Sequence, residues 1–577
     1  MTPMFIRTIA DWWRERFDQW TARVREREEQ VFLVLTLLIG ALVGAVVVAF
    51  IVLTERLGGR LYPVSGAAWR RLVMPLGGSL GMGYLLYRYF PDARGSGVPQ
   101  TKAALFARKG KITLSTLLGK FFCTSATLAS GIPLGREGPA VQVGAGISSV
   151  LGRRLGLSPE KVKALLPVGA AAAIAAAFNT PMAAVLFSLE EIMGDLHAPV
   201  LGSVVLASAT SWMVLRLLLG NEPLFHAPNY QVVHPLEFGV YALLGVVGGV
   251  VSAIFTKLLL RMRERFLQFP PGTLWFQPAA GGLLVGLIGW EVPQVLGVGY
   301  GFVGDALNGK MGLQLMGLLL ILKLLTVTIC YASGNAGGIF GPSLFIGAML
   351  GGGMGSVAHA MLPGFTATPG AYALVGMGTT FAGIVRAPMT SVMMIFEVTR
   401  DYSIIVPLMI SNLLSFFISM RLQRQPIYEA LARQDGIHLP TAESREARGK
   451  RRVNQVMRPS ADFLPAGMTV ADAIGLAQRG EFSSWLVSDE KGLVNVISTK
   501  DLEKAISEGA GEKQLVEVLQ KRTFPHVHDD QSLDLALDRM GAAGLDLLPV
   551  VSRANIRHVE GIIVLRDILK AYGIPSR

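Results

Sequence analysis

The chain has 577 residues, of which 51% are hydrophobic and only 16% are charged, and its formal net charge is +12. Soluble domains usually carry roughly a quarter charged residues, so this composition argues against a soluble protein and favours one that spans a membrane. A basic excess can indicate a nucleic-acid partner, but Lys and Arg gather on the cytoplasmic loops of membrane proteins, and we expect no nucleic acid.

Residues 1–30 form a charged segment ahead of the first apolar run. Ile9, Trp13, Phe17 and Trp20 recur there at helical spacing, which predicts an amphipathic helix lying in the headgroup region. The arginines of this segment favour a cytoplasmic N-terminus. Four arginines after the first apolar run would then lie outside, against the same rule, so the orientation of individual loops stays open: Arg56, Arg60, Arg70 and Arg71.

Long apolar runs predict several membrane-spanning helices. The first covers residues 31–54, enough to cross ~30 Å of hydrocarbon. Similar runs recur at 199–219, 236–260, 312–330 and 403–420. Shorter apolar pieces at 140–151 and 181–189 cannot span as upright helices, so we expect re-entrant or strongly tilted elements there. The sequence predicts a many-span helical protein without fixing the number of spans.

Two stretches about two hundred residues apart share the pattern K-x9-S-G-x3-G-x-x-G-P. One begins at Lys120 and the other at Lys323, and the glycines and prolines around them also match. Internal repeats with helix breaks at equivalent positions indicate a transport site between the two halves. The duplication therefore predicts a membrane transport protein.

Three motifs punctuated by Gly and Pro are candidate helix starts inside the membrane, at 95–99 (GSGVP), 135–139 (GREGP) and 338–342 (GIFGP). A helix that starts at mid-depth leaves its first N–H groups unpaired and its positive dipole end exposed. An anion can supply the missing partner. The simpler interpretation is that small residues allow tight helix packing; three motifs in register favour a site for one desolvated anion.

The composition changes near Arg421, where the apolar runs stop, and residues 433–452 are predicted to be a soluble linker. A smaller repeat follows within residues 453–577, with copies at about 453–508 and 515–575. Each copy closes with a predicted strand that runs into a helix opened by Asp. Short strands alternating with helices predict a small α/β module present twice.

This tail resembles a pair of cystathionine-β-synthase (CBS) domains, which in some proteins bind adenine nucleotides. The ribose-binding Ser/Thr-x-x-Asp element of that family fits Ser498 and Asp501, whereas the second copy keeps Asp567 but has Val564 at the hydroxyl position. The resemblance thus makes an adenine nucleotide one possible ligand of this tail. The alternative is a pair used only for packing or dimer contacts, with each Asp an ordinary N-cap.

The membrane part resembles the CLC family of chloride channels and chloride/proton antiporters. The motifs that carry the resemblance are GSGVP (95–99), GREGP (135–139), GGIFGP (337–342), FNTP (178–181) and QPIY (425–428). The likeness covers residues 31–432 and implies an all-α polytopic fold of two inverted repeats, about 31–220 and 235–420, with re-entrant or broken helices. It also implies a homodimer with one pathway per subunit.

Carried over by residue, the resemblance implies that the Ser96 hydroxyl and the Tyr428 phenol hydrogen-bond a central chloride. The backbone N–H groups of Ile339 and Phe340 would meet this ion from the second repeat. Glu137 would be the gate, occupying the pathway when ionised and swinging away when protonated. The duplication supports this role, because Glu137 has Phe340 as its counterpart and is therefore a local addition.

Lys120 and Arg136 are expected at helix starts beside the pathway, where they would raise its positive potential. Because Lys323 repeats Lys120, the alternative is that these two lysines are architectural.

Glu191 decides the mechanism that we expect. Its repeat counterpart is Val398, whereas the neighbouring Glu190 pairs with Glu397. We therefore interpret Glu190 and Glu397 as structural, near helix ends, and Glu191 as functional, since buried acids are costly in a membrane. In antiporters of the family a glutamate at this position relays protons from the cytoplasm. The resemblance thus implies chloride/proton antiport; the alternative is a passive chloride channel in which Glu191 lies in a wet vestibule.

Other function classes fit less well. A fluoride/proton exchanger should show a changed Gly-Ser-Gly element. An intramembrane hydrolase would need a nearby His, a Ser–His pair or metal ligands, and a nucleotide sensor with a membrane anchor leaves the duplicated region unexplained. We expect no enzyme, no required cofactor and no metal, with Cys123 and Cys330 as free thiols. We expect a multi-pass protein of the inner membrane with both termini cytoplasmic.

Overall fold

The computed structural model describes residues 28–63, 66–196, 199–220, 224–225, 230, 232–437, 439, 451–459, 462–477, 480, 482–519 and 524–572. The helix expected over residues 1–30 falls almost wholly outside these residues, as does most of the linker expected over 433–452. The chain divides into two compact units, Met1–Leu439 and Pro440–Arg577. We call them the membrane unit and the C-terminal unit.

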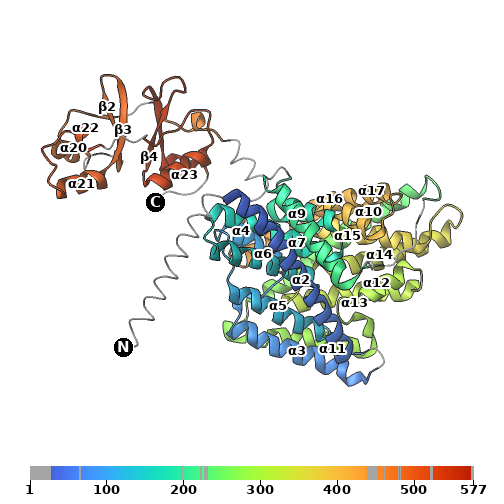
Figure 1. Cartoon of the computed structure of the whole chain (residues 1–577). Helices are drawn as coiled ribbons and strands as arrows, with labels where there is room; N and C mark the ends of the chain where they lie inside the picture. The colour runs from blue at the N-terminus through green and yellow to red at the C-terminus, as the bar shows by residue number, and fades with distance from the viewer. Residues whose placement is uncertain are drawn as a thin grey trace, which may run out of the picture. The chain divides into compact units, whose positions relative to one another are not determined.

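The described elements of the membrane unit are helices, and they form two consecutive sets (Figure 1). The first set is α2 (Glu28–Leu61), α3 (Ala68–Arg88), η1 (Pro91–Ala93), α4 (Val98–Phe106), α5 (Leu114–Ala129), α6 (Glu137–Arg154), α7 (Pro159–Phe178), α8 (Pro181–Phe187), the π-helical η2 (Ser188–Met193) and α9 (Leu201–Leu219). The second set is α10 (Glu237–Leu267), η3 (Pro271–Thr273), α11 (Gln277–Glu291), η4 (Pro293–Val295), α12 (Tyr300–Leu307), α13 (Leu313–Ala332), α14 (Phe340–Met361), α15 (Pro369–Val385), α16 (Pro388–Thr399) and α17 (Ile405–Leu422), after which α18 (Ile427–Gln434) ends the unit.

The two sets are copies related by inversion. Gly135 and Gly338, equivalent residues of the repeated motif, exchange two backbone hydrogen bonds of 2.7 Å in an antiparallel bridge. Reciprocal pairing of equivalent residues is what a two-fold axis between the repeats produces. Counterpart helices α3 and α11 also pack side by side (Figure 1). The predicted pair of inverted repeats is therefore confirmed.

Helix lengths separate spanning from broken elements. Among the described residues, seven helices are long and apolar enough to cross a membrane. By contrast, α4 has 9 residues, α8 has 7 and α12 has 8, and at about 1.5 Å per residue such helices stop well short of the ~30 Å of a bilayer core. The broken element expected at 181–189 is thereby confirmed.

The element expected at 140–151 is longer than its apolar run, and the expectation that it is re-entrant or strongly tilted stays a prediction. These residues belong to α6, a helix of 18 residues. The helix extends beyond the apolar run at both ends, from Glu137 to Arg154, and Gln142 and several glycines and serines within the run are buried by other helices.

Glycine pairs allow the close packing inside each repeat. A Cβ on Gly144 of α6 would lie 2.2 Å from the carbonyl oxygen of Gly169 on α7, and a Cβ on Gly347 of α14 would lie 2.2 Å from that of Gly376 on α15. Such distances are far below van der Waals contact. The packing interpretation of small residues therefore holds for these repeated glycines.

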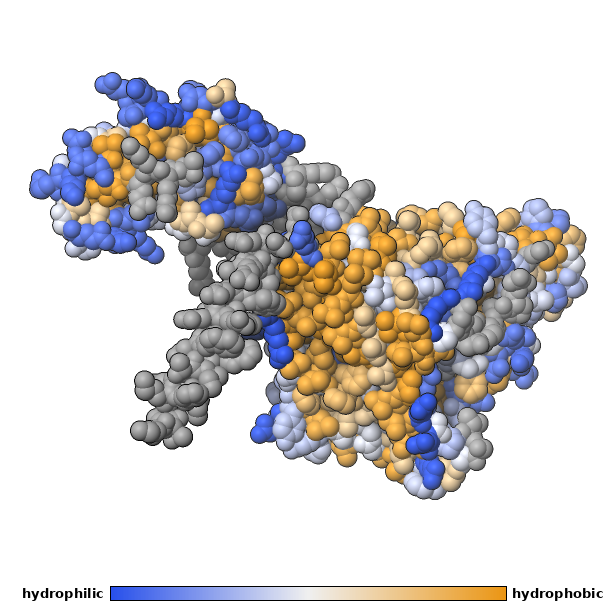
Figure 2. Space-filling view, viewed as in Figure 1, coloured by the Kyte–Doolittle hydropathy of each residue, from blue (hydrophilic) through white to orange (hydrophobic). Residues whose placement is uncertain are grey.

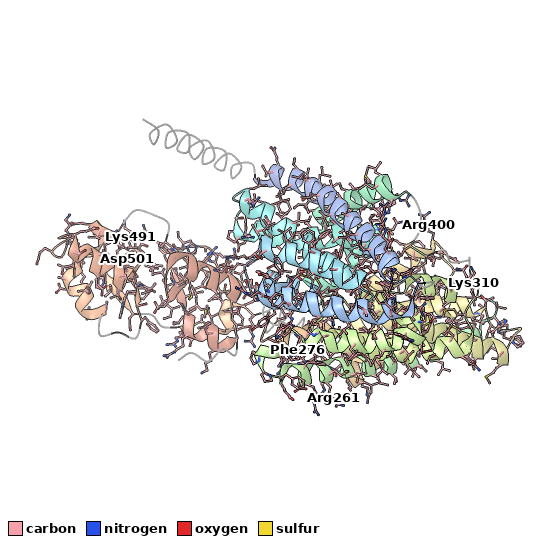
Figure 3. All side chains as sticks on the ribbon, turned by 90° about the horizontal axis from the view of Figure 1, so that it is seen from below. Arg261, Phe276, Lys310, Arg400, Lys491 and Asp501 are labelled. Carbon is pink, nitrogen blue, oxygen red and sulfur yellow. The ribbon has the colours of Figure 1, made fainter. Side chains whose placement is uncertain are left out.

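The surface of the membrane unit is largely apolar. Figure 2 shows apolar side chains covering most of the face in view, as expected for helices in contact with lipid. Figure 3 places Arg261 and Phe276 toward one end of this unit and Lys310 and Arg400 toward the other. The first end is where the unit finishes, because Arg263 of α10 pairs with Asp435, just after α18, at 2.5 Å.

The C-terminal unit contains two small sheets. Its elements are η5 (Val453–Gln455), β1 (Phe463–Pro465), α20 (Val470–Ala477), β2 (Ser484–Asp489), β3 (Gly492–Ser498), α21 (Thr499–Ser507), α22 (Leu515–Val518), α23 (Leu533–Ala543), β4 (Leu547–Val551), β5 (Val559–Val564) and α24 (Leu565–Ala571). One sheet has the order β1-β2-β3, and β4 pairs with β5 in the other. Val453 is buried in the core of the second copy, with Leu533 and Leu548, so the start of the first copy completes the second.

Candidate functional site

Three helix starts meet inside the membrane unit. α4 begins after Gly97, whose φ is +103°, a conformation that favours glycine. A Cβ on Gly97 would lie 2.2 Å from the carbonyl oxygen of Gly138, so the starts of α4 and α6 touch. The Gly135–Gly338 bridge joins the starts of α6 and α14 in turn. The convergence expected from the three motifs is thus present in the fold.

Two hydroxyl groups close to these helix starts are buried without partners. Ser96 and Tyr428 are each 0% exposed, and within the described part of the chain neither hydroxyl has a hydrogen-bond partner. Tyr428 lies on α18, which packs against α4, the helix that follows Ser96. Buried polar groups are nearly always hydrogen-bonded in proteins. The two unpaired hydroxyls therefore indicate a binding site for a ligand that is not part of the chain.

The second repeat contributes backbone N–H groups from the start of α14. Ile339 is the N-cap residue and Phe340 the first helical residue. The Phe340 ring packs against Phe178, Phe187 and Phe381, with ring centroids 4.7, 5.5 and 4.3 Å away. This packing fixes the start of α14 in an apolar surrounding, where its free N–H groups need an acceptor.

The carboxylate of Glu137 is that acceptor in this structure. Its Oε2 accepts a hydrogen bond from the Gly341 N–H at 3.1 Å, and its Oε1 accepts one from the Tyr300 hydroxyl. Glu137 is 0% exposed. The carboxyl group thus occupies the N-terminal end of α14 in the manner of a bound anion.

Arg136 lies beside Glu137, but its side chain pairs with another acid. It is the N-cap residue of α6, as expected, and its guanidinium donates to Glu55 Oε1 at 2.7 Å. It also lies over the Tyr300 ring, 5.5 Å from the centroid. Glu55 is mostly exposed, whereas Arg136 is buried, so the cation next to Glu137 is linked to a solvent-facing acid.

The expected position of Lys120 at a helix start is wrong. Lys120 lies inside α5, is 0% exposed, and donates to the carbonyl oxygens of Ala93, at 3.0 Å, and Gly95. Lys323 makes the equivalent bonds in the second repeat, to Val295 at 2.9 Å and Gly297 at 2.7 Å. A buried ammonium needs acceptors, and both lysines find them in the loop before a short helix. This geometry fits the alternative that Lys120 and Lys323 stabilise the fold.

Glu191 belongs to a second charged cluster, which includes Lys102 of α4, the helix that follows Ser96. It lies in η2 and is 6% exposed. The Lys102 ammonium on α4 contacts Glu191 Oε1 at 2.8 Å and Glu429 Oε1 on α18 at 3.8 Å. The Glu429 side chain is 19% exposed, against 7% for Glu191. The three residues form a buried ion cluster with Glu429 as its outermost member.

Sequence reasoning missed Lys102, Tyr300 and Glu429. For the first two a signal existed: by the offset that relates Gly95 to Gly297, Tyr300 has Val98 as its counterpart and Lys102 has Gly304. Each is a polar addition to one repeat, which is the same signal that Glu137 gives.

In the C-terminal unit the residues expected at a nucleotide site are engaged with the protein. Ser498 and Asp501 form a capping box at the start of α21, with Ser498 Oγ and Asp501 Oδ2 at 2.6 Å. Asp567 accepts two hydrogen bonds from Arg458, of 2.6 and 3.1 Å. Ser498 is therefore the N-cap of α21 and Asp501 its N3 residue, so the alternative that each Asp is itself an N-cap is wrong, and Asp567 forms an ion pair with Arg458.

A sequence model of the voltage-gated chloride channel family matches residues 78–420, which is more than half of the chain. The chain belongs to this family. A CBS-domain model matches residues 453–508 and 516–574, so the expected CLC membrane part with a CBS tail is confirmed. CLC proteins are transport proteins, and this one is a membrane protein with many helices.

Several proteins similar to this chain are H(+)/Cl(-) exchange transporters. The H(+)/Cl(-) exchange transporter ClcA of Vibrio campbellii is 33% identical over 354 residues, 60% of this chain and 76% of the relative. ClcA of Salmonella paratyphi B is 32% identical over 433 residues, 71% of this chain and 91% of the relative.

Solved structures agree with the fold. A slow cyanobacterial Cl-/H+ antiporter has a TM-score of 0.65 at 26% identity, covering 70% of this chain and 97% of that chain. A eukaryotic CLC transporter has a TM-score of 0.63 and covers 93% of this chain and 97% of that chain. Its identity is 20%, so it speaks for the fold alone.

Proposed function

We propose that this CLC protein exchanges chloride for protons across the membrane. The observation that carries the proposal is the Glu137 carboxylate, which is buried at the start of α14 and takes the place of an anion on its N–H groups. A titratable group inside an anion pathway ties the passage of the anion to protonation. The exchange transporters among its relatives support the same function.

The chloride site proposed here uses the groups left free by the fold. The Ser96 and Tyr428 hydroxyls donate to the ion, and the N–H groups of Ile339 and Phe340 meet it from α14. Protonation of Glu137 removes its charge and its hold on the Gly341 N–H. The side chain then leaves, and chloride takes its place on the helix end.

The proton route proposed here uses Glu191. The Lys102 Nζ lies 2.8 Å from Glu191 Oε1. This ion pair allows the buried Glu191 carboxylate to be ionised. Glu429 lies on the far side of Lys102 and is the most exposed of the three, so we assign it the exchange of protons with water. The alternative, a passive chloride channel, would leave Glu191 and Glu429 without a proton to carry.

A fluoride/proton exchanger is the less favoured alternative. One CLC-type fluoride/proton antiporter has a TM-score of 0.60 but an identity of 24%, which speaks for the fold alone. The Gly95-Ser96-Gly97 element is intact here, and its hydroxyl is free to bind chloride.

The assembly proposed is a homodimer in the bacterial inner membrane, with one pathway in each subunit and both termini in the cytoplasm. Large apolar side chains on α9 and α17 are exposed on one subunit and are available to a second: Val205, Met213, Leu217, Val406, Met409 and Phe417. α8 packs against α9, α16 packs against α17, and α8 and α16 pack against each other.

For the CBS pair we propose a structural role that needs no cofactor. An adenine nucleotide at Ser498 and Asp501 would have to open the capping box of α21, and one at Asp567 would have to displace Arg458.

The domain boundaries that we propose are those expected from the sequence, with a membrane domain over 31–432 and CBS copies at about 453–508 and 515–575.

The test uses the purified full-length protein in liposomes with a chloride gradient and a pH electrode outside. Exchange predicts proton movement against the proton gradient, driven by chloride. Chloride flux without proton movement would make the protein a channel. The absence of chloride flux, with fluoride-driven proton movement, would favour the fluoride exchanger.

A further inference from the structure

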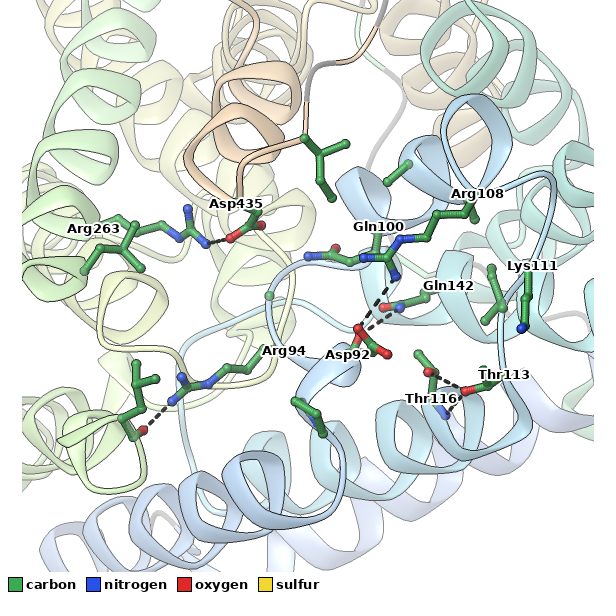
Figure 4. A pocket seen from close by; sticks show the side chains of 18 residues that line it. Asp92, Arg94, Gln100, Arg108, Lys111, Thr113, Thr116, Gln142, Arg263 and Asp435 are labelled. Carbon is green, nitrogen blue, oxygen red and sulfur yellow. Dashed lines mark hydrogen bonds and ion pairs between the residues drawn. The ribbon is translucent and has the colours of Figure 1, made fainter. Parts of the chain in front are cut away.

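A cavity of about 340 Å³ lies at the end of the membrane unit where α10 and α18 finish. Its wall comes from residues 91–116, from α6, from the end of α10 and from the chain after α18 (Figure 4). The residues that we assign to chloride or to protons are absent from this wall. The volume is in the range of small-molecule sites, which begin at roughly 300 Å³, and is far larger than one chloride ion requires.

The cavity carries an excess of positive charge. Four cations and two carboxylates line it. The carboxylates are already paired, Asp435 with Arg263 at 2.5 Å and Asp92 with Arg108 at 3.6 Å. Arg94 and Lys111, the other two cations, have no carboxylate partner in the described part of the chain. Figure 4 shows that these cations come from different sides of the cavity. Their net field favours an anion.

Two polar atoms in the wall are buried without a partner among the described residues. Gln142 is 2% exposed; its Nε2 donates to Asp92 O at 3.3 Å, but its Oε1 has no partner. Arg94 donates one N–H to Leu274 O, and its Nε has no acceptor. Groups in this state normally find a ligand or water. The Arg94 Nε–H is a donor without an acceptor and so favours an anion in the cavity, whereas Gln142 Oε1 is an acceptor that calls for water or a ligand hydroxyl group.

The start of α5 adds to the same field. Thr113 is the N-cap of this 16-residue helix and lines the cavity, so the positive end of the helix dipole faces it. Guanidinium groups, an ammonium and a helix start are the usual partners of phosphate oxygens. We propose that the cavity between α5, α6 and α10 binds a phosphate group, carried either by an anionic lipid headgroup or by a water-soluble phosphate compound.

The first experiment measures the thermal unfolding of the full-length protein in detergent, with and without inorganic pyrophosphate. A bound ligand stabilises the fold by mass action, and we expect the unfolding temperature to rise by roughly 2 °C or more. Lys111→Gln, an exposed position, should lose most of this rise. Lys109→Gln is the matched control, because this neighbouring lysine lies outside the cavity wall and its loss should leave the rise intact.

Three results would overturn the proposal. The first is no rise in the wild type. The second is an equal rise in Lys111→Gln and Lys109→Gln, which would mean an adventitious ion on surface cations only. The third is a slower chloride flux in Lys111→Gln with no response to pyrophosphate in either protein, which would make the cavity a mouth for chloride.

The source of the phosphate is decided in nanodiscs of phosphatidylcholine with or without cardiolipin. If cardiolipin stabilises the wild type and Lys109→Gln but not Lys111→Gln, and abolishes the response to pyrophosphate, the ligand is a lipid headgroup. If the response to pyrophosphate is the same in both kinds of disc, the ligand is a water-soluble phosphate. Arg94→Gln is a second variant at the site and should reproduce the loss seen with Lys111→Gln.

Discussion

Glu190 and Glu397 cap each other's repeats. Glu190 of η2 accepts hydrogen bonds from the Met389 and Thr390 N–H groups at the start of α16, at 3.2 and 2.8 Å. In the same way, Glu397 of α16 accepts hydrogen bonds from the Met182 and Ala183 N–H groups at the start of α8, at 2.9 and 2.7 Å. The expectation that these two acids are structural and lie near helix ends is confirmed, and the caps tie the two repeats together.

Glu397→Gln should therefore destabilise the protein without changing the mechanism. Losing a carboxylate cap costs about 1–2 kcal/mol, which is measurable as a lower unfolding temperature in detergent. Glu190→Gln should have a similar effect, because it removes the equivalent cap. The ratio of chloride to protons should stay that of the wild type in both variants. A changed ratio in either one would assign that glutamate to the proton route.

Glu137→Ala should leave chloride flux and abolish proton coupling. The substitution removes the carboxylate that occupies the start of α14 and leaves its N–H groups open to chloride. Glu137→Gln is the informative companion, because it keeps the shape of the protonated acid while removing the titration. Fluxes of both ions in liposomes test this, and proton transport that survives either substitution would contradict the assignment.

Tyr300→Phe should speed the exchange cycle. The Tyr300 hydroxyl is one of two donors that hold the Glu137 carboxylate, and a hydrogen bond to a charged group contributes about 1.5–3 kcal/mol. Since the carboxylate leaves α14 in each cycle, removing the donor should raise turnover by up to roughly tenfold with coupling retained. Tyr84→Phe, on the exposed side of α3, is the control and should behave as the wild type. A slower Tyr300→Phe protein with an unchanged control would contradict this role.

The Glu191–Lys102 pair allows a cycle of substitutions. Lys102→Gln leaves an ionised Glu191 buried and unpaired, and breaking such a pair costs about 3–5 kcal/mol. Glu191→Gln should reduce proton movement while chloride still passes. The double variant should recover much of the stability lost in Lys102→Gln, because neither charge remains. A double variant as unstable as Lys102→Gln would show that the pair is not the source of the cost.

The repeat explains how much of this site could be predicted. The positions of Ser96, Glu137 and Phe340 follow from motifs that repeat along the chain, and short helices follow from Gly and Pro at matching places. The Lys102 contact does not follow, because it joins α4 to a π-helical turn 89 residues later. Only the packing of the helices brings those two segments together.

The hydropathy of the sequence also left some of the long helices unpredicted. α7 and α14 are long and apolar enough to span a membrane, yet neither stands out as a long apolar run, because each is rich in Ala or Gly. Their sides face other helices rather than lipid, so small side chains serve them better than large apolar ones. The apolar runs of α2, α9 and α17 face outward, which is why the sequence predicted these helices.

The last prediction concerns the C-terminal unit. Arg458 pairs with Asp567 through two hydrogen bonds, and its backbone exchanges hydrogen bonds of 2.8 and 2.9 Å with Ile562 of β5. Arg458→Gln should therefore lower the free energy of unfolding of this unit by about 1 kcal/mol, a modest value because the pair is partly exposed. Asp567→Asn should cost the same, and the double variant no more than either.

The wild type and a further variant, Asp501→Ala, test the absence of a nucleotide requirement. Because Asp567 is held by Arg458, and Ser498 and Asp501 hold each other, millimolar ATP should not raise the unfolding temperature of the wild type. Exchange in liposomes should also be the same with and without ATP on either side. Stabilisation by ATP that is lost in Asp501→Ala would contradict this, because it would mean that the capping box opens to take the ribose.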